Sequence, residues 1–82
     1  MTTIRFFAAA RAAVGVDSLT TTGRTIEAAL GAIDAVEVAD PERWSALQER
    51  CSYLVDGVTT RDRATSLDGV EVVDVMPPFA GG

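Results

Sequence analysis

The sequence predicts a small α+β domain in which a mixed sheet of about five strands curls around one main helix. Short runs at both ends of the chain alternate in polarity, as half-buried strands do. One stretch between them has the spacing of an amphipathic helix. A length of 82 residues suits a single small core, and nearly half of the residues are apolar, so the chain should fold.

The first strand is predicted over residues 3–8, where successive side chains point to opposite faces. Ile4 and Phe6 share one face, whereas Arg5 and Phe7 share the other. If the main helix covers Ile4 and Phe6, Phe7 is left on the outer face, where an exposed aromatic residue often marks an interface. The alternative is that Phe7 lies in a minor core under the loops.

The alanine-rich residues 9–14 are expected to form a helical turn that ends at Gly15, because glycine readily adopts the left-handed conformation at a helix end. The threonine-rich residues 17–22 then return as a second strand. The short connection predicts that the first two strands pair like a hairpin.

The main helix is predicted to begin after Thr25, whose hydroxyl can cap it, with Glu27 favouring the first turn. Its apolar residues recur at i, i+3, i+4 and i+7. They are Ile26, Ala29, Leu30, Ile33 and Val36. Asp40 and Pro41 mark the start of a second, short helical segment. Trp44 lies in that segment and is expected to pack in the core or at its edge rather than to bind a ligand.

The third strand is predicted over residues 51–55, and Asp56-Gly57 is a hairpin turn leading into a fourth strand over residues 58–60. Cys51 is expected to be a buried apolar side chain rather than a sulfur-bearing thiol. A polar loop and the anchor residue Leu67 then precede a second turn, Asp68-Gly69.

The last strand is predicted over residues 70–76 and contains a phase break. Val70 and Val72 have one parity, whereas Val73 and Val75 have the other. Either a bulge near Val72 and Val73 restores a single apolar face, or the strand is central and buried on both sides.

Composition excludes several classes of function. The net charge of -5 argues against a nucleic-acid partner, because phosphate binding needs a concentrated positive patch. With no histidine and one cysteine, a metal site or histidine acid–base catalysis is not expected. The apolar stretches are too short to span a membrane, and the start of the chain lacks the pattern of a secretory signal, so we expect a cytoplasmic protein.

The sequence ends on a glycine pair, Gly81-Gly82. Two residues without a Cβ make the thinnest tail that a protein can present, so they can pass through a narrow channel into another protein's active site. The terminal carboxylate would then be the reacting group. A frayed terminus of no functional consequence is the alternative, since chain ends are usually poorly ordered.

Motifs spread over the whole chain point to one known family. They are residues 4–8 (IRFFA) with Arg11 and Gly15, the hairpin Val55-Asp56-Gly57, the turn Asp68-Gly69, and the ending Pro77-Pro78-Phe79-Ala80-Gly81-Gly82. The chain resembles the ubiquitin-like β-grasp sulfur carriers, and more narrowly the MoaD-like small subunit of molybdopterin synthase. Phe79 stands where a smaller residue is often found, and Met76 where an aromatic residue is common, which bears on the partner more than on the chemistry.

The resemblance implies a β-grasp domain over residues 1–76 and a flexible Gly-Gly tail over residues 77–82. It implies a carrier rather than a catalyst, with no cofactor of its own. An E1-like enzyme would use ATP to adenylate Gly82, and a sulfur donor would convert the adenylate to a thiocarboxylate. The MoaE-like large subunit would then take the sulfur into cyclic pyranopterin monophosphate.

The same resemblance places a partner surface near the root of the tail, where we expect Phe7, Val58 and Met76 to form an interface patch. Two alternatives share parts of the pattern. The first is a ThiS-like carrier for thiamine or cysteine biosynthesis; the carrier for thiazole synthesis shares the fold and the Gly-Gly ending but is usually shorter and lacks the two prolines. A non-covalent β-grasp interaction module with an accidental glycine pair belongs to a different class.

Overall fold

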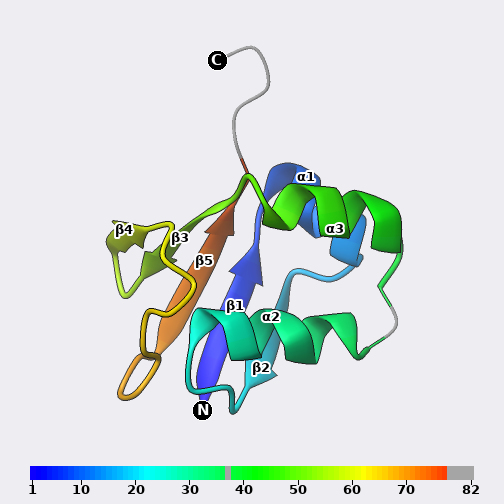
Figure 1. Cartoon of the computed structure of the whole chain (residues 1–82). Helices are drawn as coiled ribbons and strands as arrows, with labels where there is room; N and C mark the ends of the chain where they lie inside the picture. Colours follow the sequence, from blue (N-terminus) through cyan, green and yellow to red (C-terminus); the bar gives the residue numbers. More distant parts are fainter. Residues whose placement is uncertain (37, 78–82) are drawn as a thin grey trace.

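The computed structural model describes residues 1–36 and 38–77. Its elements, in chain order, are β1 (Thr2–Phe6), α1 (Ala8–Val14), β2 (Ser18–Thr21), α2 (Ile26–Asp34), α3 (Pro41–Gln48), β3 (Ser52–Val55), β4 (Val58–Thr60) and β5 (Val72–Met76). The five strands form one mixed sheet in the order β2-β1-β5-β3-β4 (Figure 1). The predicted fold class, a mixed sheet with one main helix in a β-grasp arrangement, is therefore confirmed.

The first and last strands of the sheet lie side by side in its centre. They run parallel, with Ile4 opposite Val73 and Phe6 opposite Val75, whereas all other pairs of neighbours are antiparallel. The expected β1–β2 and β3–β4 pairs both form. Asp56 and Gly57 join the second pair with φ angles of 46° and 89°, which is the left-handed geometry of a tight two-residue hairpin turn.

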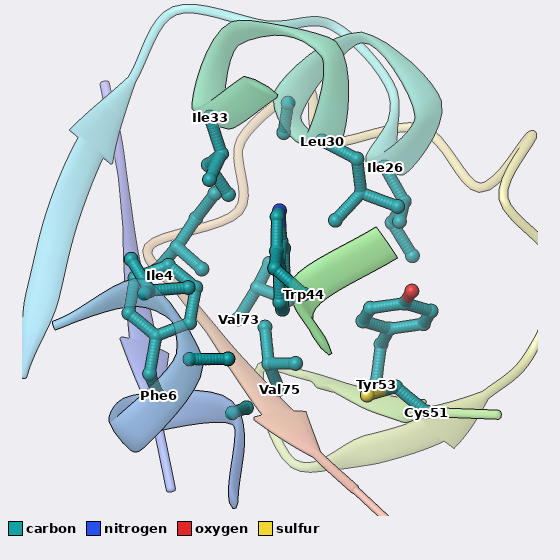
Figure 2. Packing of buried hydrophobic residues seen from close by; sticks show 14 of the residues in the cluster. Ile4, Phe6, Ile26, Leu30, Ile33, Trp44, Cys51, Tyr53, Val73 and Val75 are labelled. Atoms are coloured by element: carbon teal, nitrogen blue, oxygen red, sulfur yellow. The ribbon is translucent and has the colours of Figure 1, made fainter. Parts of the chain in front are cut away.

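All three helices contribute to one core on one face of the sheet. Figure 2 shows Ile26, Leu30 and Ile33 of α2 pointing toward the side chains of the central strands. Trp44 of α3 packs edge-on against Phe6, with ring centroids 5.7 Å apart. The indole N–H of Trp44 donates to Asp34 over 3.1 Å, so this large buried side chain leaves no unpaired donor. The expected burial of Trp44, Cys51 and Leu67 is confirmed.

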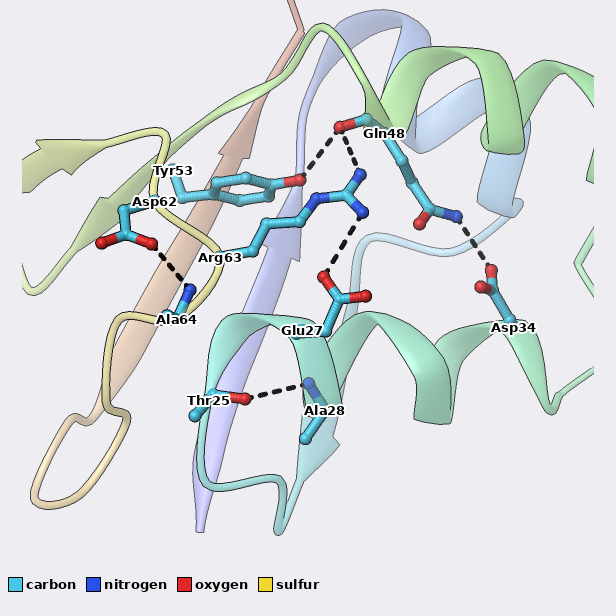
Figure 3. Close-up of polar contacts among 9 residues, drawn as sticks. All are labelled: Thr25, Glu27, Ala28, Asp34, Gln48, Tyr53, Asp62, Arg63 and Ala64. Carbon is cyan, nitrogen blue, oxygen red and sulfur yellow. Dashed lines mark hydrogen bonds and ion pairs between the residues drawn. The ribbon is translucent and has the colours of Figure 1, made fainter.

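The helix ends follow the predicted chemistry. The Thr25 hydroxyl accepts from the Ala28 amide over 3.1 Å, and the Asp40 carboxylate accepts from the Arg43 amide over the same distance (the first is drawn in Figure 3). Gly15 ends α1 with φ 95°, in the left-handed region. Within the described ranges, 1–36 and 38–77, no helix has the length and apolar character needed to cross a bilayer.

The main helix is shorter than predicted. It ends at Asp34, and Val36, which the spacing places on the buried stripe, is 49 % exposed. The Val36 amide donates to the Ile33 carbonyl, three residues back, over 3.1 Å. Such a tight last turn rotates the following residue away from the position that a continuing α-helix would give it. The prediction for Val36 was therefore wrong.

The last strand also begins later than predicted. The Val70 amide donates to the Leu67 carbonyl, so Val70 belongs to a turn. The Asp56 carboxylate accepts from the amides of Glu71 and Val72 over 3.2 and 2.9 Å. From Val72 onward the side chains alternate regularly between buried and partly exposed, so neither the predicted bulge nor a strand buried on both faces was right.

Candidate functional site

The face of the sheet opposite the core carries no helix among the residues that the structure describes. We call it the open face. Its side chains have the parity opposite to the buried ones and are partly or fully exposed. They are Ser18 and Thr20 of β2, Thr3 and Arg5 of β1, Val72, Asp74 and Met76 of β5, Ser52 and Leu54 of β3, and Thr59 of β4.

Phe7 and Met76 lie at the same end of the open face. In the parallel β1–β5 pair, Phe6 lies opposite Val75, and Phe7 and Met76 are the residues that follow them on the two strands. Phe7 is 38 % exposed, and its backbone is still extended. The prediction that Phe7 lies on the outer face is confirmed, and the alternative of a minor core is wrong. The chain leaves β5 immediately after Met76, so this pair lies at the root of the tail.

Val58 does not join this pair. It lies opposite Val55, whose side chain packs against the core, so Val58 has the parity of the helix-covered face. It lies on the edge strand β4 and is 68 % exposed. The two-residue turn Asp56-Gly57 fixes this register, so the sequence contained the signal that places Val58 on the other side.

Leu54 is the hydrophobic residue of β3 that does reach the open face. It is partly exposed and lies opposite Asp74, one row from the Ser52–Met76 pair. The sequence analysis missed Leu54 because the faces of β3 were not matched with those of the neighbouring strand β5. The apolar part of the open face near the tail is thus made by Phe7, Met76 and Leu54.

The tail itself is described only at its first residue. Pro77 is buried, directly after β5. Pro78, Phe79, Ala80, Gly81 and Gly82 lie outside the described residues. β5 ends near α1 and α3, so the tail begins at the end of the sheet where these two helices lie (Figure 1).

The chain matches one known protein family over nearly its whole length. The sequence model of the ThiS family matches residues 4–82, from β1 through the two glycines. The chain belongs to the ThiS family of ubiquitin-like sulfur carriers. A search of curated proteins found no match. Carriers of the ThiS family work with an E1-like activating enzyme and with a synthase that uses the sulfur.

The one thiol of this ThiS-family carrier is not placed for sulfur transfer. Cys51 is buried, and burial raises the pKa of its thiol to about 11, although Arg63 and Arg61 act in the opposite direction. The thiol is therefore protonated at neutral pH and shielded from reagents, whereas the thiolate is the reactive form. The described residues also hold no cluster of three or more side chains suited to a metal ion.

A polar network fixes the segment that leads into β3, close to the root of the tail. Arg63 donates to the Gln48 carbonyl over 2.9 Å and pairs with Glu27 over 3.4 Å (Figure 3). The Tyr53 hydroxyl donates to the same Gln48 carbonyl over 3.3 Å, and burial is the main cause of its raised pKa. These contacts tie α2, α3 and the loop after β4 together. In this ThiS-family member, the tail therefore starts at an end of the domain whose elements are joined by hydrogen bonds and an ion pair.

Proposed function

We propose that this carrier serves molybdenum cofactor biosynthesis as the small subunit of molybdopterin synthase, with Gly82 as the reacting residue. The observation that carries the proposal is the ending itself. Pro77-Pro78-Phe79-Ala80-Gly81-Gly82 follows directly on the central strand β5 of a sulfur-carrier domain, and the family match extends to the last glycine. The proline pair favours this pathway over thiazole synthesis, whose carriers share the family and the two glycines.

The chemistry follows from the weakness of a carboxylate as an electrophile. A carboxylate oxygen of Gly82 attacks the α-phosphorus of ATP and releases pyrophosphate, which gives an acyl-adenylate. A donor that delivers sulfur as hydrosulfide then attacks the acyl carbon and AMP leaves, which gives the terminal thiocarboxylate. Its nucleophilic sulfur forms a bond to cyclic pyranopterin monophosphate, and water hydrolyses the resulting thioester, which leaves the sulfur on the pterin and regenerates the carboxylate.

The partners supply the catalytic groups for these steps. ATP belongs to the E1-like enzyme, and the carrier binds no cofactor of its own. The chain has no histidine, and its cysteine is buried, so its own contribution is to dock and to present the tail. Two prolines at the root reduce the conformational freedom that the tail loses on insertion. Residues 77–82 can reach at most about 20 Å when extended, so the body must dock close to the partner's active site.

We place the docking surface on the open face around Phe7 and Met76, with Leu54 beside them. The MoaE-like subunit and the E1-like enzyme would use it in turn, because both need the same tail. Val58, on the other side of the sheet, would be reached only by a partner that wraps around the β4 edge. An exposed aromatic residue beside the departing tail supports this placement.

The test has two stages. The protein is first incubated with the E1-like enzyme, ATP and a sulfur donor, and mass spectrometry looks for replacement of one terminal oxygen by sulfur. The thiocarboxylated protein is then given to the MoaE-like subunit with cyclic pyranopterin monophosphate, and in parallel to a thiazole synthase with its substrates. Sulfur transfer to the pterin alone is expected. Transfer to thiazole alone would contradict the pathway, and a terminus that never gains sulfur would contradict the carrier role.

A further inference from the structure

An ion pair lies in the middle of the open face. The Arg5 side chain of β1 donates through Nε to Oδ1 of Asp74 over 2.6 Å, and through Nη2 to Oδ2 over 2.9 Å. The two residues are direct neighbours in the parallel β1–β5 register. The Arg5 side chain is 50 % exposed and that of Asp74 is 18 % exposed. Asp74 thus holds the guanidinium in a fixed, planar, two-bond geometry while leaving its outer edge in solvent.

The same guanidinium also contacts Phe7. Cζ of Arg5 lies 5.6 Å from the centre of the Phe7 ring, within the range of a cation–π contact. Arg5 therefore connects the polar centre of the open face to the aromatic residue at the root of the tail. Exposed ion pairs contribute little to stability. Stability alone is therefore a weak reason for this charged pair.

The N–H groups of Arg5 limit which partners can cover this face. Two N–H groups of Arg5 bind Asp74, and the remaining ones have no acceptor among the described residues. In the free protein, water satisfies them. A partner that covers the open face removes that water, and a buried donor without an acceptor is costly. The partner must therefore bring an acceptor to Arg5.

A hollow beside Arg5 has room to receive that acceptor. Its volume is about 280 Å³, and its lining includes Arg5, Phe7, Arg11, Asp17 and Ser18. Arg11 is paired with Asp17 over 2.8 Å, and both of these side chains are largely exposed. Arg5 and Arg11 thus both line a space that a partner's acidic side chain could enter, and each keeps N–H groups beyond those that bind its aspartate.

We propose that Arg5, positioned by Asp74, is a specificity determinant that receives a carboxylate side chain of the E1-like activating enzyme in this hollow. The inference rests on the proposed function, since it assumes that the tail is activated by such an enzyme. The carboxylate completes the hydrogen bonds of the guanidinium, and the Phe7 ring packs beside the pair.

A charge swap separates recognition from structure. Arg5→Asp combined with Asp74→Arg keeps the intramolecular pair and the net charge, but presents a carboxylate to the hollow. Arg5→Met removes the donors and keeps much of the side-chain length. Arg24→Met is the matched control, because Arg24 lies on a different surface, in the turn before α2. Binding to the purified E1-like enzyme, adenylation and thermal unfolding are measured for each, at low and at moderate salt.

The swap is expected to weaken binding about a hundredfold through like-charge contact, and Arg5→Met about tenfold with a smaller dependence on salt. Both should unfold within a few degrees of the wild type, and Arg24→Met should bind normally. Wild-type affinity in either Arg5 variant, or an unchanged salt dependence in Arg5→Met, would overturn the role of Arg5. A wild-type chain that is not adenylated would instead overturn the carrier assignment.

Discussion

The structural role of Phe7 and its proposed docking role can be separated by measurement. The residue is 38 % exposed, and its ring centre lies 5.6 Å from Cζ of Arg5. Full burial of a phenylalanine contributes about 1.5–3 kcal/mol. We therefore expect Phe7→Ser to weaken binding to the MoaE-like subunit by about tenfold, the lower end of what that range implies. Calorimetric affinity and the melting temperature should be measured together, and unchanged affinity or a collapsed fold would remove Phe7 from the interface.

Cys51 makes the stability of the domain sensitive to high pH. Its pKa in the folded state, about 11, lies above the value of 9.0 for a free thiol, so the unfolded chain loses the proton first. The stabilising contribution is full below pH 9 and is lost as the pH rises toward about 11. Tyr53, whose pKa is also raised, acts in the same direction.

Denaturant unfolding at pH 7, 9 and 11 checks this expectation. The free energy of unfolding should be nearly constant from pH 7 to 9 and should fall beyond it. In Cys51→Ala the fall should be smaller, with the Tyr53 part remaining. An identical pH profile in the two proteins would show that Cys51 does not titrate on unfolding.

At the scale of elements, one side chain joins the β3–β4 hairpin to the start of β5. The Asp56 carboxylate holds the amides of Glu71 and Val72, and its own backbone is left-handed at φ 46°. Asp56→Ala leaves two amides without this partner and puts alanine in an unfavourable conformation. We expect a loss of about 1–2 kcal/mol, which lowers the melting temperature by roughly 4–8 °C for each kcal/mol.

Asp56→Asn is the matched control, because asparagine tolerates the left-handed region and keeps one acceptor oxygen. Its loss should be clearly smaller than that of the alanine variant. Equal melting temperatures for the alanine variant and the wild type would show that water replaces the carboxylate at no cost.

Element boundaries mark the limit of what the sequence predicts. The caps at Thr25 and Asp40 and the turn at Asp56-Gly57 were correct because each depends on local chemistry. The phase break near Val72 was misread because the start of the strand depends on Asp56. The Asp56 carboxylate binds the Val72 amide and is 16 residues away along the chain. The predictions for Val36 and Val58 were wrong for a related reason. The position of Val36 depends on where the helix ends, and that of Val58 depends on the register between β3 and β4.

At the scale of the whole molecule, residues 2–76 supply the described helices and strands, and we expect that the last glycine can be removed without loss of the fold. Deleting Gly82, or adding a peptide tag after it, should leave the melting temperature unchanged within about a degree, because tail residues bury little surface. Thiocarboxylation should vanish in both variants. Normal sulfur transfer by the tagged protein would refute the role of Gly82.

The family could be inferred from the sequence because each of its motifs is local. Gly82 as the reacting residue stays a prediction. The open face could be anticipated from the alternation around Phe7. Its composition could not, because Arg5, Asp74 and Leu54 meet only through the pairing of β1, β5 and β3, which joins residues far apart in the chain.

The parallel pairing of β1 with β5 also affects how the protein is made. Residues 3–6 find their partners in residues 72–75, so the middle of the sheet closes only when nearly the whole chain has been synthesised. Pairings over such a separation form late and slowly. A fragment that stops before β5 lacks both the centre of its core and the glycine pair. Completion of the sheet and synthesis of the proposed carrier end therefore come close together in time, and we expect incomplete chains not to be adenylated.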